Sequence, residues 1–208
     1  MAEKVVYKVV CALLGLAAIP LAIFNPIIRI VGDISVTKTY VGEDVSFRDI
    51  YELFFAKGST FSGFGDFKLT DPVRATMPAL IASGVFLALA ILFGLAGAVI
   101  AVGTRKKLPV LLLSAGSMLC IIGMFIAFNR FFAAPYVDGT ISIADLGFIE
   151  EGILESIFSS LMHLELLKIS SAGFLLLGLY SASFLWTGAY MLVELGEPKD
   201  KEKKKKKA

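Results

Sequence analysis

The fold is decided by residues 78–128, which read PALIASGVFLALAILFGLAGAVIAVG, then TRKK, then LPVLLLSAGSMLCIIGMFIAF. Two apolar runs, 78–103 and 108–128, are joined by a turn that carries Arg105, Lys106 and Lys107. Each run is long enough for a helix to cross a hydrocarbon layer, which takes ~20 residues. A short basic turn between two such runs is typical of a helical hairpin whose turn faces the cytoplasm.

Two further apolar runs, 9–28 and 169–193, complete a set of four predicted spans. Lys4 and Lys8 precede the first run, and the lysine-rich tail follows the fourth. Because basic residues favour the cytoplasmic side, we expect both termini to be cytoplasmic and the segments 29–77 and 129–168 to be external. We therefore predict a multi-pass α-helical protein of the plasma membrane, built as a four-transmembrane-helix bundle.

The chain has 208 residues, of which 57% are hydrophobic, so there is room for one bundle and a small external module but not for a separate soluble domain. We expect a single domain over 1–193 and a lysine-rich, disordered cytoplasmic tail over 194–208. Pro78 and Pro109 are predicted to lie at helix starts, where the missing N–H of proline costs nothing.

The external segments are predicted to form an α+β module. Residues 30–41 read as strand with a break at Gly32-Asp33, which indicates a hairpin or short antiparallel sheet. Residues 47–57 have apolar side chains at helical spacing after a capping-box-like Ser46-x-x-Asp49. Residues 148–167 have an apolar face opposite a polar one, which predicts an amphipathic helix on the bilayer or against the first external segment.

Phenylalanines are interleaved with glycine and serine in STFSGFGDF, residues 59–67. Such a pattern cannot bury every ring on one regular face, and interface energy concentrates in a few aromatic anchors. We take the partner-binding residues to be Phe55, Phe61, Phe64 and Phe67. Two other interpretations stay open: the rings tuck under the sheet, or they dip into the lipid headgroups without recognising a protein.

The sequence offers no catalytic, cofactor-binding or metal-binding constellation. The predicted spans contain no Asp, Glu, Lys, Arg or His, although ion-coupled transporters usually place such groups in the membrane. Glu150, Glu151 and Glu155 together have the oxygen ligands that a divalent cation prefers, but we interpret them as a solvated helix face, which is the far commoner arrangement of such residues. Nucleic-acid binding is not expected, since the basic tail lacks interleaved aromatics and arginines.

Small residues recur at every fourth position in the apolar runs, as in Ala90, Gly94 and Ala98 and again in Gly178 and Ala182. This spacing places them on one helical face and lets helix backbones approach closely. Serines within the spans have no neighbouring base. Their expected role is hydrogen bonding between helices.

The layout of four spans, two cytoplasmic ends and a longer first external segment with strand character resembles the claudin and peripheral-myelin type of tetraspan protein. That family carries a tryptophan in a GLW triplet and two cysteines in its first external segment, whereas 29–77 has neither residue type and Trp186 lies in the fourth span. The resemblance covers topology, and no functional residue is carried over. It implies an external sheet on a left-handed four-helix bundle and a role in lateral or cell–cell association.

Three classes of function follow from these features. The first, which we favour, is a non-catalytic membrane protein that organises or assists other membrane proteins through its external module. The alternative is a channel, a transporter or a permease subunit for a neutral or apolar solute. The third is an enzyme acting on lipid or envelope precursors, which would need the external acidic groups around a cleft. Membrane lipid and either a protein partner or a second copy are the expected partners.

Overall fold

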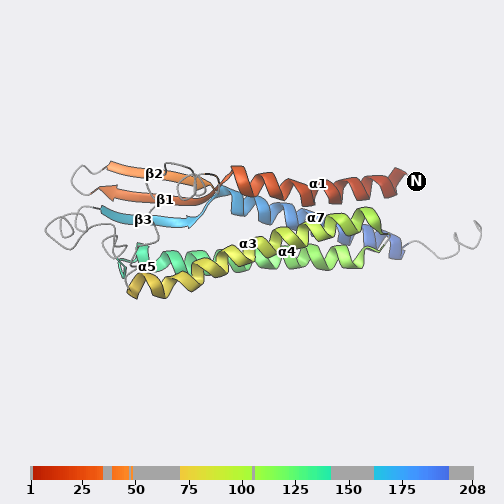
Figure 1. The fold of residues 1–208 in the computed structure, drawn as a ribbon. Helices are drawn as coiled ribbons and strands as arrows, with labels where there is room; N and C mark the ends of the chain where they lie inside the picture. The colour runs from red at the N-terminus through yellow and green to blue at the C-terminus, as the bar shows by residue number, and fades with distance from the viewer. Residues whose placement is uncertain are drawn as a thin grey trace, which may run out of the picture.

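The computed structural model describes residues 2–34, 39–46, 48, 71–104, 106–141 and 162–196. Four long helices run beside one another and form the bundle seen in Figure 1: α1 (Ala2–Phe24), α3 (Asp71–Gly103), α4 (Leu108–Ile126) and α7 (Ser171–Gly196). The helix α4 continues as a π-helix, η2 (Ala127–Ala133), and then as a last helical turn, α5 (Ala134–Val137). All four long helices are long and apolar enough to cross a membrane.

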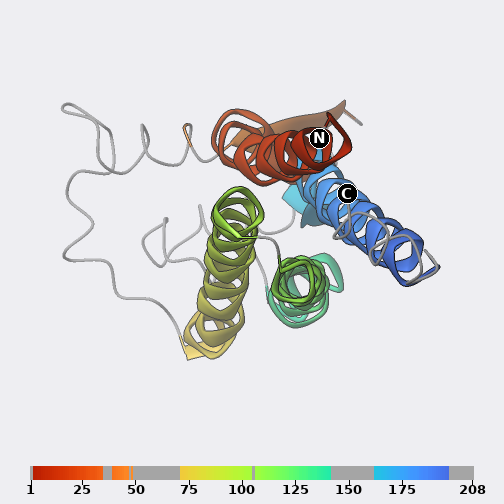
Figure 2. The same ribbon diagram turned by 90° about the vertical axis from the view of Figure 1, so that its right-hand side faces the viewer.

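The helices form a closed ring in the order α1, α3, α4 and α7, as the end-on view in Figure 2 shows. Successive members of this ring contact one another, and α7 contacts α1. The interior is filled by large side chains whose exposure is below 2%, among them Tyr180, Phe128, Ile121, Met124 and Leu176. Close packing of this kind is the main source of helix association within a bilayer.

A three-stranded sheet lies at one end of the bundle, opposite the end where α1 begins and α7 finishes (Figure 1). Its strands are β1 (Pro26–Ile34), β2 (Thr39–Ser46) and β3 (Met162–Ile169), in the order β2-β1-β3. Both pairings are antiparallel. The central strand therefore follows the first long helix, and its outer neighbour β3 precedes the last one.

The four predicted spans are confirmed as helices, but several of their boundaries were wrong. α1 ends at Phe24 because Pro26 already belongs to β1, so residues 26–28 are strand. α3 begins at Asp71 with Pro72 next, and Pro78 lies inside it. Pro109 does lie at the start of α4. At the other end, α7 continues to Gly196, three residues into the predicted tail.

The external helix predicted over 148–167 was wrong where the structure describes it, since Met162–Ile169 is strand β3. Gly32-Asp33 does not break the first strand, because both residues pair with β2 on one side and β3 on the other. The predicted short antiparallel sheet is confirmed, and β1 and β2 are antiparallel neighbours within it. The helix predicted over 47–57 lies, apart from Arg48, outside the described residues.

Small residues and serines hold the helices together as expected in part of the bundle. Ala90 and Ala98 of α3 are buried, and a Cβ added at Gly94 would lie 2.5 Å from Tyr180 Cε1 of α7. Ser114 and Ser183 are hydrogen-bonded across α4 and α7 at 3.0 Å. In contrast, Gly178 has open space where its Cβ would be and Ala182 is exposed, so this second small-residue face packs on nothing within the described residues.

Candidate functional site: the junction between sheet and bundle

Two strands of the sheet continue directly from two helices of the bundle. Asn25 alone separates α1 from β1, and Ser170 alone separates β3 from α7. The Ser170 backbone N–H donates to the Ile27 carbonyl oxygen at 2.6 Å, which extends the β1–β3 pairing to the helix ends. Ile27 and Ile169 are buried at this point. Both strands are therefore held by hydrogen bonds and apolar packing at the position where they leave the bundle.

The π-helix η2 contributes a third attachment. The backbone N–H of Ile169 donates to Oδ1 of Asn129 at 2.9 Å, so a side chain from the α4 end of the bundle satisfies a donor on β3. A buried N–H without a partner costs ~1–3 kcal/mol, and the asparagine removes that cost. Single π turns inside helices recur at functional positions. Here the π-helix carries Asn129, whose side chain links this helix to the sheet.

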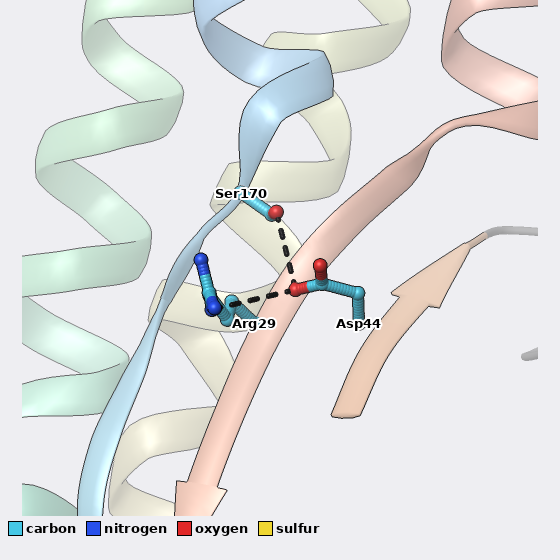
Figure 3. Close-up of polar contacts among 3 residues, drawn as sticks. All are labelled: Arg29, Asp44 and Ser170. Carbon is cyan, nitrogen blue, oxygen red and sulfur yellow. Dashed lines mark hydrogen bonds and ion pairs between the residues drawn. The ribbon is translucent and has the colours of Figure 1, made fainter. Parts of the chain in front are cut away.

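The carboxylate of Asp44 links β2 to the junction between β3 and α7, as Figure 3 shows. Oδ1 of Asp44 lies 3.7 Å from Nε of Arg29 on the neighbouring strand and accepts from the Ser170 hydroxyl at 3.4 Å. The side chains of Arg29 and Asp44 are 55% and 43% exposed, so solvent weakens this ion pair. Asp44 also lies beside the N-terminus of α7, where the helix dipole favours a negative charge.

Strand β3 is packed against the helices on one side. Leu164 and Leu167 of β3 pack against the buried side chains of Val73, Tyr136 and Ile141. The Tyr136 hydroxyl is hydrogen-bonded to Thr76 Oγ1 at 3.1 Å. The extension of α3 and α5 beyond the bundle thus supplies the apolar surface that a small sheet needs to be stable.

The predicted site residues Phe55, Phe61, Phe64 and Phe67 lie outside the described residues, and so do the acidic residues 150, 151 and 155. Within the described part of the chain, no group of three His, Cys, Asp or Glu side chains could hold a metal ion. Sequence reasoning missed the attachment residues Arg29, Asp44, Asn129 and Ser170. The one available signal was Ser170-Ser171 ahead of an apolar run, a pattern typical of a helix N-terminus.

Comparison of the chain with protein-family models, with curated proteins and with solved structures finds no match in any of the three. The arrangement at the junction can hold the sheet in a fixed position relative to the four helices.

Proposed function

We propose that this chain is a non-catalytic integral membrane protein that organises or assists other membrane proteins through its sheet-containing module. The observation that carries the proposal is the attachment of β1 and β3 to the bundle, sealed by the 2.6 Å hydrogen bond from Ser170 N–H to the Ile27 carbonyl. A module held in one position gives up less conformational freedom when it binds a partner, and this raises affinity.

The packing of the bundle interior favours binding over solute conduction. Tyr180, Phe128 and Ile121 are buried between the helices, and passage through a single copy would require them to move. Membrane bundles held by such close packing have few alternative arrangements at low free energy. The transport alternative is therefore less well supported than partner binding.

We also propose which side of the membrane the sheet occupies. Lys106 and Lys107 lie at the end of the bundle away from the sheet, together with the first residues of α1 and the last turn of α7. Cytoplasmic placement of that end would put the sheet outside the cell at the plasma membrane. A sheet beside a four-helix bundle, with strands after the first helix and before the fourth, is in keeping with a claudin-like layout.

The partner surface that we propose consists of Phe55, Phe61, Phe64 and Phe67, because aromatic anchors dominate binding energy at interfaces. The test replaces Phe61, Phe64 and Phe67 by serine in the full chain, followed by native purification in mild detergent and identification of the co-purified proteins. We expect the partner to be lost while expression and membrane insertion stay unchanged. Replacing the same three residues by tyrosine should preserve partner binding, because the ring is kept.

Phe131→Ser provides a matched control, since this phenylalanine is 59% exposed on η2 and lies outside the proposed surface. A partner that stays bound to the triple serine variant would contradict the proposal. So would glycerol flux through liposomes that contain only the wild-type protein, and that result would favour the transport alternative.

A further inference from the structure

Two basic residues face each other across the sheet. Arg29 of β1 pairs with Lys168 of β3 in the register, and both side chains are exposed. On the other side of β1, Arg29 pairs with Asp44 of β2. The row Asp44, Arg29, Lys168 thus carries two positive charges and one negative charge. Like charges directly opposite each other destabilise a sheet. An anion bound between Arg29 and Lys168 would therefore stabilise it.

Asp44 does not neutralise both cations. The strand order β2-β1-β3 places Asp44 and Lys168 two strand spacings apart, ~10 Å between backbones. Asp44 already lies beside Arg29 at 3.7 Å and the Ser170 hydroxyl at 3.4 Å. Among the residues that the structure describes, Lys168 forms no ion pair. A positive charge therefore remains on the β3 side of this row.

With the hydrocarbon core taken to begin at Ser171, the first residue of α7, the row lies within side-chain reach of the lipid headgroups. Lys168 precedes the first residue of α7, Ser171, by three residues, which is ~10 Å at the rise of a strand. The headgroup layer extends roughly 5–8 Å beyond each edge of the hydrocarbon core. Lysine and arginine side chains are long enough to close the remaining distance. Both cations can thus reach the phosphate layer of the leaflet on the sheet side.

We propose that Arg29 and Lys168 bind the phosphate of a phospholipid on the sheet side of the membrane. The guanidinium and the ammonium both donate to phosphate oxygens, and these charge-assisted hydrogen bonds are stronger than neutral ones. Binding would also relieve the repulsion between the two cations. This site goes beyond the proposed partner-binding role and does not depend on it, because it requires only the sheet and the membrane.

The test measures the melting temperature of the purified full chain in a neutral detergent. Phosphatidylglycerol is titrated against the wild-type protein, Lys168→Gln and the double variant Arg29→Gln/Lys168→Gln. Each lost cation should weaken the apparent affinity about fivefold, as expected for ~1 kcal/mol per basic residue near a lipid surface. A galactolipid with the same acyl chains and no phosphate should not distinguish wild type from variant.

Three comparisons separate ligand binding from a structural role. Without lipid, Lys168→Gln should melt at the wild-type temperature or above it, because one of two repelling charges is gone. Lys168→Arg should keep the response to phosphatidylglycerol. Arg74→Gln should also keep it, since Arg74 is exposed at the start of α3 and pairs with Asp71 there.

An equal affinity of the wild type and Lys168→Gln for phosphatidylglycerol would overturn the proposal. A melting shift by inorganic phosphate as large as that by the lipid would assign the pair to a soluble anion instead. Loss of a co-purified protein from Lys168→Gln with unchanged lipid affinity would overturn it too, since the row would then recognise a protein.

Discussion

At the scale of single residues, the bundle depends on a glycine opposite a tyrosine. Gly94 of α3 leaves the space that the Tyr180 ring of α7 occupies, and Tyr180 is 1% exposed. The small-residue spacing predicted close packing along α3 correctly. It predicted the same for Gly178 and Ala182, which pack on nothing described, because spacing shows which residues are small and not which helix lies opposite.

The two glycines make a matched pair for measurement. Gly94→Ala should lower the melting temperature, because its Cβ would lie 2.5 Å from Tyr180 Cε1 and overpacking costs about 1–3 kcal/mol. Gly178→Ala adds the same methyl group to a helix with nothing within 4 Å, so it should be neutral or stabilising. Equal melting temperatures for the two variants would show that Tyr180 does not lie against Gly94. Tyr180→Leu should partly rescue Gly94→Ala.

At the scale of elements, β3 shows why the amphipathic pattern of residues 148–167 predicted a helix where the chain forms a strand. Its sequence MHLELLKI contains three leucines, and leucine, glutamate and lysine favour helix. Pairing with β1 overrides that local preference, as tertiary context often does. The pairing joins residues far apart in the chain, and no short-range signal in 162–169 points to it. The same reason hid the attachment by Asn129, whose partner is Ile169.

Elements at the other end of the bundle are joined by Lys107. Its ammonium lies 2.6 Å from Glu194 Oε1 of α7 and over the rings of Tyr190 and Tyr7, at 4.7 and 5.3 Å from their centroids. The Lys107 side chain is 12% exposed. Lys8 of α1 adds a hydrogen bond to the Val102 carbonyl near the end of α3. The basic turn therefore has a packing role in addition to its predicted role in orientation.

We expect Lys107→Met to destabilise the bundle by about 1–2 kcal/mol, the sum of a partly buried ion pair and a cation–π contact. At about 2–4 °C per kcal/mol for a chain of this size, thermal melting resolves the change. Lys106→Met is the control, because Lys106 is exposed in the same turn, and it should stay within ~0.5 kcal/mol. Indistinguishable melting of the two variants would mean that Lys107 does not hold α1 and α7 together.

At the scale of the whole molecule, apolar run length was sufficient to predict the four helices. Alternation was sufficient to predict strand within 30–41, but the break was misplaced at Gly32-Asp33, which lies inside β1. What could not be predicted is that both segments between the helices build one sheet. Run length and alternation are local properties, whereas the β1–β3 pairing and the bond from Ser170 to Ile27 form only when α1 and α7 lie side by side.

The proposed binding role and the phosphate site both require that this single sheet is fixed to the bundle. Cysteines at Val31 and Leu166, in a chain whose Cys11 and Cys120 are replaced by alanine, test it directly. A protease site inserted after Thr104 allows the chain to be cut between the two cysteines. Directly paired residues on antiparallel strands lie within the Cα separation that a disulfide spans, about 4.4–6.8 Å.

The protein with Val31→Cys and Leu166→Cys is oxidised in membranes, cleaved and denatured for gel electrophoresis. We predict that its two halves stay joined until a reductant is added. The diagonal pair Val31→Cys/Lys168→Cys should separate, because diagonal neighbours lie ~7–8 Å apart. Separation of the first pair, or equal cross-linking of both pairs, would contradict the β1–β3 register and with it the single fixed sheet.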